Sequence, residues 1–170
     1  MTDRVILGGN WYIQEINQAH RIAECGLPDL RMNTEQFVMS GGYFTFDSPT
    51  EVSALGFEIA LQGAHEAVRG RFGREPGDWT TFTYYERTKD LDTNKNFSRV
   101  VSITGLVNGI ANPRIVGRRP GVTRYAGGSV WKYIDIQDGK VIHRFDFRRN
   151  ILVADGVEIS ATGNDILRIN

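Results

Sequence analysis

Apolar and polar residues alternate with a period of two along much of the chain, which is the pattern of β-strands that bury one face. Phe57, Ile59 and Leu61 hold alternate positions of one such stretch, and Val101 and Ile103 hold those of another. The pattern predicts two strands whose apolar faces meet in a core. The residues between them are polar or small and are expected to face away from that core.

Residues 31–39 also alternate, but neither set of positions is cleanly apolar, so this strand is expected to border something polar. Ser40-Gly41-Gly42 then breaks the strand. Three aromatic residues follow this break: Tyr43, Phe44 and Phe46. Two interpretations stay open: the rings fold back onto the chain's own core, or they lie on a protruding loop that a neighbouring molecule covers.

Apolar residues recur at helical spacing after Gly63, which predicts a short amphipathic helix over residues 64–72. Residues 122–137 form a long β-prone run in which Gly127-Gly128 predicts a bend or bulge. Asp-Gly pairs at 138–139 and 155–156 predict hairpin turns. The tail, residues 165–170, alternates once more and is expected to be a strand.

Composition narrows the class of protein. The chain has 170 residues, enough for one well-buried core, so a single domain over residues 1–170 is expected. Twenty basic and twenty acidic residues cancel, which argues against a large phosphate-neutralising surface. The single cysteine, Cys25, is expected to be a buried thiol. No apolar run is long enough for a membrane span or a signal peptide, so we expect a soluble chain made in the cytoplasm.

Candidate chemistry is sparse. The three histidines are far apart in the sequence and lack the spacing of metal ligands, and no nucleophile or phosphate-binding motif is found. We therefore expect no enzyme, no metal and no cofactor. The aromatic stretch 79–85 resembles a base-stacking platform, but alternating aromatics more often pack a core. Residues 112–121, with Arg114, Arg118 and Arg119, are interpreted as a solvated basic turn.

An ordered series of short motifs resembles the major tail tube protein of contractile-tailed bacteriophages, a family that includes R-type pyocin tubes. The series runs through Leu27-Pro28-Asp29-Leu30, Thr34-Glu35-Gln36-Phe37, Gly41-Gly42 and Phe72-Gly73. It continues more loosely through Tyr133-Ile134-Asp135, Asp138-Gly139, Phe145-Asp146 and Asn164-Asp165-Ile166-Leu167. Each motif is weak alone, and their joint order carries the resemblance. The chain departs from the family pattern at residues 43–46.

The resemblance implies a mainly β fold: a β-sandwich or split barrel with one short flanking helix. Hexameric rings would stack into a hollow tube, and their inner strands, residues 31–39 and 56–62, would join one continuous barrel. The tube would conduct phage DNA into the host cell without sequence-specific binding. The implied partners are the tail sheath, the baseplate hub and the tail terminator, and the implied location is the virion tail, with synthesis in the host cytoplasm and no membrane contact.

The resemblance also implies site residues. Residues 39–55 would reach the adjacent ring, and the contact would be made by Ser40, Gly41, Gly42, Tyr43, Phe44, Thr45, Phe46 and Asp47. The candidates for facing the lumen are Asn33, Glu35, Glu58, Gln62, Ser102 and Thr104. Two alternatives stay open: the tube of a phage-derived contractile injection system, and a small β-barrel that binds a ligand in its interior.

Overall fold

A computed structural model describes residues 4–169 and is mainly β. The strands are β1 Arg4–Ile13, β2 Ile16–Asn17, β3 Ile22–Gly26, β4 Met32–Val38, β5 Thr45–Val52, β6 Phe57–Gln62, β7 Thr80–Asp90, β8 Asn96–Ala111, β9 Val122–Gln137, β10 Lys140–Asp146, β11 Ile151–Ala154 and β12 Val157–Glu158. The helices are α1 Glu66–Arg69 and α2 Ala161–Leu167. No helix in residues 4–169 is long and apolar enough to cross a membrane.

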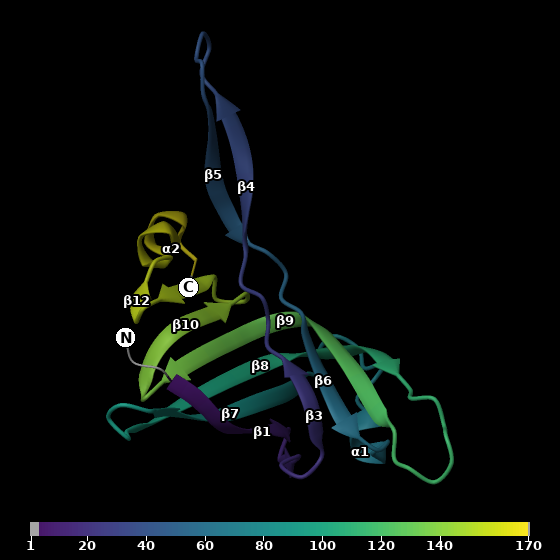
Figure 1. Cartoon of the computed structure of the whole chain (residues 1–170). Coiled ribbons are helices and arrows are strands. Elements are labelled where there is room, and N and C mark those ends of the chain that lie inside the picture. The colour runs from purple at the N-terminus through teal and green to yellow at the C-terminus, as the bar shows by residue number, and fades with distance from the viewer. Residues whose placement is uncertain (1–3, 170) are drawn as a thin grey trace.

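Ten strands form one antiparallel sheet in the order β12-β11-β10-β9-β8-β7-β1-β2, and β3 and β6 join it through β9. The sheet curves strongly, and β9 arches over it so that β3 and β6 lie in front of β1 and β7 (Figure 1). The pairing of β9 with β8 shifts register between Thr104 and Leu106 of β8 and again between Val107 and Gly109. These irregularities lie opposite Gly127 and Gly128, so the bend expected from that glycine pair is confirmed.

The core fills the concave side of this curved sheet. Trp11 packs against Tyr84 and Phe57, and the Phe57 ring centroid lies 4.6 Å from that of Phe82. The predicted inward residues are all buried: Phe57, Ile59, Leu61, Val101 and Ile103. Phe82 and Tyr84 are buried as well, so the aromatic run of β7 packs the core and offers no stacking platform through these two rings.

The chain differs from the sequence expectation at both helices. The helix expected over residues 64–72 is only α1, because the chain turns at Gly70 and Phe72 forms an isolated bridge with Val107 of β8. Residues 165–170 were expected to be a strand, but residues 165–167 are the end of α2. That helix is held by a buried Asn164, whose side-chain amide donates to the Asn150 carbonyl oxygen at 2.9 Å.

Cys25 is exposed and not the buried thiol expected from composition. It lies in β3, which pairs with β6 on one side only within the described residues. A side chain on an edge strand lacks the second neighbour that would cover it. The wrong prediction therefore reflects a sheet edge, which the local sequence does not reveal.

Candidate assembly surface

A two-stranded hairpin, β4 and β5, projects away from the sheet (Figure 1). Both strands are exposed on both faces over nearly their whole length. Residues 31–39 were expected to be an inner strand of the barrel, as residues 56–62 were, and residues 39–55 were expected to be a loop. Instead β4 pairs with β5 outside the main sheet, and most of the expected loop is a strand.

The hairpin starts and ends at defined points. The chain leaves β3 at Gly26 and returns to the sheet at β6, after Leu55 has entered the core. At its base, Asn33 donates to Glu51 at 2.6 Å and accepts a hydrogen bond from the Ser53 hydroxyl at 2.7 Å. The bond from Asn33 also lowers the pKa of Glu51. These contacts join the two strands where they leave the body of the molecule.

The hairpin tip is a glycine turn. The Gly42 amide donates to the Met39 carbonyl oxygen at 2.7 Å, and Gly41 has a φ of 77°. That value lies in the left-handed region, where glycine has no side chain to clash. The break predicted at Ser40-Gly41-Gly42 is therefore confirmed. Thr45 and Asp47 lie in β5 beyond it, and both are exposed.

The outer half of the hairpin exposes a group of apolar side chains. This tip patch consists of Phe37, Val38, Met39, Tyr43, Phe44 and Phe46, all exposed. Tyr43 is 95% exposed, Phe44 87% and Phe46 66%. Of the two interpretations left open for these aromatics, folding onto the chain's own core is wrong. A concentrated exposed apolar patch on a soluble surface is typical of an interaction site.

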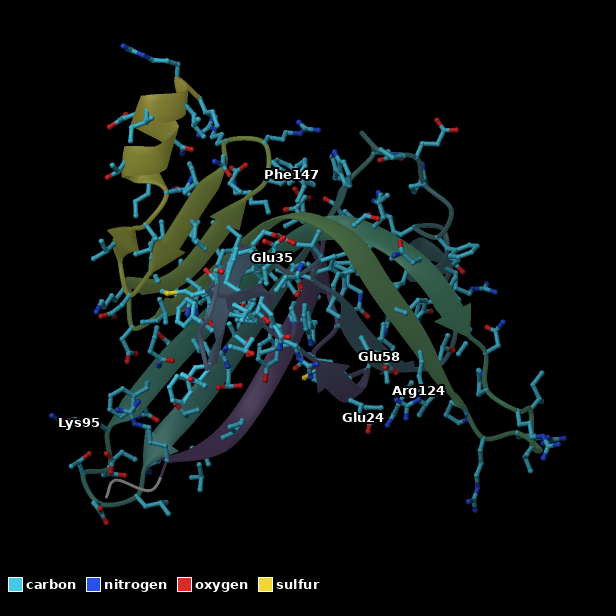
Figure 2. All side chains as sticks on the ribbon, turned by 90° about the horizontal axis from the view of Figure 1, so that it is seen from above. Glu24, Glu35, Glu58, Lys95, Arg124 and Phe147 are labelled. Carbon is cyan, nitrogen blue, oxygen red and sulfur yellow. The ribbon has the colours of Figure 1, made fainter. Side chains whose placement is uncertain are left out.

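A second surface lies on the outer face of β3, β6 and the first half of β9. Here the Arg124 Nη1 atom lies 2.6 Å from a Glu24 carboxylate oxygen and 3.0 Å from one of Glu58. Figure 2 shows the three labelled side chains gathered there. These hydrogen bonds, the one to Glu58 first, raise the pKa of Arg124. The face thus combines two carboxylates with one guanidinium.

The six lumen candidates lie in three places. Glu58 and Gln62 are exposed on β6, where the strand packs its apolar face inward. Ser102 and Thr104 are half-buried on β8, on the other side of the bend in β9, and Thr104 lies 3.4 Å from the Thr81 hydroxyl. The other two candidates, Asn33 and Glu35, lie on the hairpin. The structure therefore does not bring all six together.

Sequence reasoning missed Glu24 and Arg124 on the β6 face. Arg124 lies between the inward-pointing Thr123 and Tyr125, both buried, so the alternation along β9 is the signal that places it outward. Glu24 gives no comparable signal because β3 is short. Within residues 4–169, no group of three or more His, Cys, Asp or Glu side chains is placed to hold a metal ion.

Comparison with known proteins agrees with this picture of an assembly surface. No curated protein matches the chain significantly. A family model described as phage tail tube protein FII matches residues 3–165, nearly the whole chain. The chain therefore belongs to the phage tail tube protein FII family and is a structural component of a virion tail tube.

Proposed function

We propose that the chain forms hexameric rings that stack into the inner tail tube, through which phage DNA passes into the host cell. The observation that carries the proposal is the exposed tip patch on a hairpin that projects from a well-packed body. Burying three aromatic rings at about 25 cal/mol per Å² is worth several kcal/mol for each hairpin before ordering costs. Ring symmetry repeats that contact at every junction.

Ring closure has candidate edges in the same sheet. The outer edge of β3 pairs with no other strand in residues 4–169. The pairing of β8 with β7 ends at Thr80 opposite Gly105, so residues 106–111 of β8 have β9 on one side and only the bridge from Phe72 on the other. We propose that β3 of one copy pairs with this part of β8 in the next copy. Such pairing would satisfy both edges and close a continuous barrel.

The direct test is electron microscopy of the purified chain with sedimentation over a range of concentrations. Rings and hollow tubes are expected. A chain that stays monomeric at high concentration and forms neither rings nor tubes would sink the proposal. The same images give the symmetry of the ring.

The lumen surface we propose is the outer face of β6, with Glu58 and Gln62, in place of the wider set of candidates that also included Asn33, Glu35, Ser102 and Thr104. Two carboxylates, Glu24 and Glu58, share one guanidinium, Arg124, so this group on the β6 face carries a small excess of negative charge. A surface that does not neutralise phosphates releases no counterions and does not hold DNA. Such a lining would let DNA slide.

Glu58→Lys should convert the lumen into one that holds DNA. The new lysine would face Arg124 without a buried ion pair being lost, because both side chains are half exposed and such pairs contribute about 1 kcal/mol or less. Tubes of this variant should retain about tenfold more short duplex DNA in a nuclease-protected form at low salt than tubes of the parent chain.

Ser102→Lys is the matched control for this experiment. It adds the same charge on β8, beyond the bend in β9. Tubes of this variant should hold no more nuclease-protected DNA than tubes of the parent chain. If tubes of the Ser102→Lys variant protect DNA from nuclease instead, the lumen would be lined by β8 and not by β6. Loss of assembly in the Glu58 variant would place Glu58 in an interface between subunits.

The resemblance leaves the tube of a contractile injection system as the near alternative for the same structure. A ligand-binding β-barrel is the alternative from another class, and the core argues against it. Trp11, Phe82 and Tyr133 are almost fully buried where such a ligand would sit. A groove of about 610 Å³ lies instead at the surface beside the hairpin base, lined in part by Trp79 and Trp131.

The proposal also includes the passage of DNA, the hexameric symmetry of the ring, and contacts with the sheath, the baseplate hub and the terminator. Synthesis in the host cytoplasm and an organisation as a single domain belong to it too. What supports them together is the family membership and the presence of exposed apolar side chains on a projecting element. Images of rings and tubes would support the assembly but would leave each partner to its own binding experiment.

A further inference from the structure

The hairpin and one loop of the same chain have opposite charge. Residues 32–52 contain three carboxylates, Glu35, Asp47 and Glu51, and no lysine or arginine. The β8–β9 loop, residues 112–121, contains three arginines, Arg114, Arg118 and Arg119, and no acidic residue. All six charged side chains are exposed.

The loop also exposes apolar side chains between its arginines. Ile115 is 92% exposed and Val116 is 71% exposed. No ion pair within residues 4–169 involves an arginine of this loop. The loop therefore offers two apolar side chains flanked by arginines, and the hairpin offers the apolar tip patch flanked by carboxylates. The two surfaces are complementary in both charge and polarity.

The base of the loop is held in place. The Gly63 amide donates to the Gly121 carbonyl oxygen at 2.8 Å, and Pro113 contacts Gly121. Pro113 and Pro120 also fix their own φ angles near the two ends. A loop with an anchored base loses less conformational freedom when a partner binds, which favours its use as a docking surface.

The two elements lie at opposite ends of the molecule. The hairpin points to the top of Figure 1, whereas the loop between β8 and β9 hangs at the lower right. The C-terminal segment with α2 lies on the hairpin side, so a copy stacked above would not present that segment to the hairpin. Surfaces that are complementary but lie at different places on one chain join copies head to tail, and such contacts build open assemblies when the rotation between copies does not close a ring.

We propose that the hairpin tip of one copy docks on the β8–β9 loop of a second copy in the adjacent ring. This inference rests on the proposed function, since it names the receiving surface of the ring-to-ring contact. Glu35 pairs with Ser48 and Asp47 with Gln36, so the two carboxylates lie on opposite faces of the hairpin and flank its tip on both sides. In the proposed contact the loop arginines lie against these flanks, and the tip patch covers Ile115 and Val116.

A charge exchange tests the pairing. One variant carries Glu35→Lys and Asp47→Lys, a second carries Arg114→Glu and Arg118→Glu, and a third carries all four changes. Each reversal alone should raise the concentration for half-maximal tube assembly by about tenfold or more, because like charges then meet. The combined variant should return to within about threefold of the parent chain.

The matched control reverses two exposed cations elsewhere, Arg87→Glu and Lys95→Glu; the turn that carries Lys95 lies far from the hairpin (Figure 2). Combined with the hairpin reversal, it should restore nothing. Thermal melting monitored by circular dichroism should be nearly unchanged in all variants, since surface substitutions usually shift stability by about 0.5 kcal/mol or less.

The outcomes separate this inference from the proposed function. A parent chain that forms neither rings nor tubes refutes the function itself. Rings that stack normally after the loop reversal, or a combined variant no better than either single reversal, overturn the docking on the loop alone. If the loop reversal leaves stacking intact but removes binding of short duplex DNA, the β8–β9 loop binds DNA and not the hairpin. That result would also overturn the inference.

Discussion

Tyr43→Ser, Phe44→Ser and Phe46→Ser together are expected to abolish tube formation while the chain stays folded. The three rings are the most concentrated part of the tip patch and make no contribution to the core, which is built from other aromatics. Serine removes most of the apolar area that stacking would bury, worth roughly several kcal/mol per hairpin. Repeated around a ring, that loss is larger than any single-residue effect elsewhere on the surface.

Electron microscopy and sedimentation measure this result. The variant should remain as rings or smaller species at concentrations at which the parent chain forms tubes. Phe147→Ser is the matched control, because Phe147 is 83% exposed but lies on the turn after β10 and not on the hairpin. Unchanged tubes in the triple variant, or loss of its folded circular dichroism spectrum, would contradict the assignment of these rings to the contact between rings.

Gly127→Ala is expected to destabilise the chain severely, by about 3 kcal/mol or more. Gly127 pairs with Phe57 across β6 and β9, and a Cβ at this position would overlap the Phe57 ring. That ring cannot move easily, because it packs against Trp11 and Phe82 in the core. The backbone of β9 would have to shift at the point where the sheet bends.

Denaturant unfolding of the dissociated chain tests the glycine. Gly8→Ala is the control, since no atom lies within 4 Å of a Cβ built there, and its unfolding midpoint should be nearly unchanged. Adding Phe57→Leu to the Gly127 variant should recover part of the loss, because the shorter side chain leaves space. Equal midpoints for the Gly8 and Gly127 variants would show that the core accommodates the methyl group.

The sequence alone predicted those elements whose signals are local. The bounds of β9 match the predicted residues 122–137, and the turn at Asp138-Gly139 has φ values of 48° and 82°, as a two-residue hairpin requires. The alternation in β6 gave the buried side of the strand correctly. In each case, the residues themselves carry the geometry or the periodicity.

What sequence reasoning could not provide depends on partners far away in the chain or outside it. Residues 31–39 lack an apolar face because both faces of β4 are exposed in a single copy, so no periodicity indicates that β5 is its partner. Asn164 looks like a residue of a polar tail, yet two hydrogen bonds with Asn150 fix α2. The grouping of Glu24, Glu58 and Arg124 arises only when three strands align.

The attachment of the hairpin has a consequence for how the family can diversify. Gly26 and Glu58, at its two points of departure, are register partners in neighbouring strands, so the sheet already holds both ends of the insertion together. The hairpin can therefore lengthen, shorten or change its tip residues without altering the topology of the body. Natural selection can thus change which copies join end to end while leaving the folding of each copy untouched.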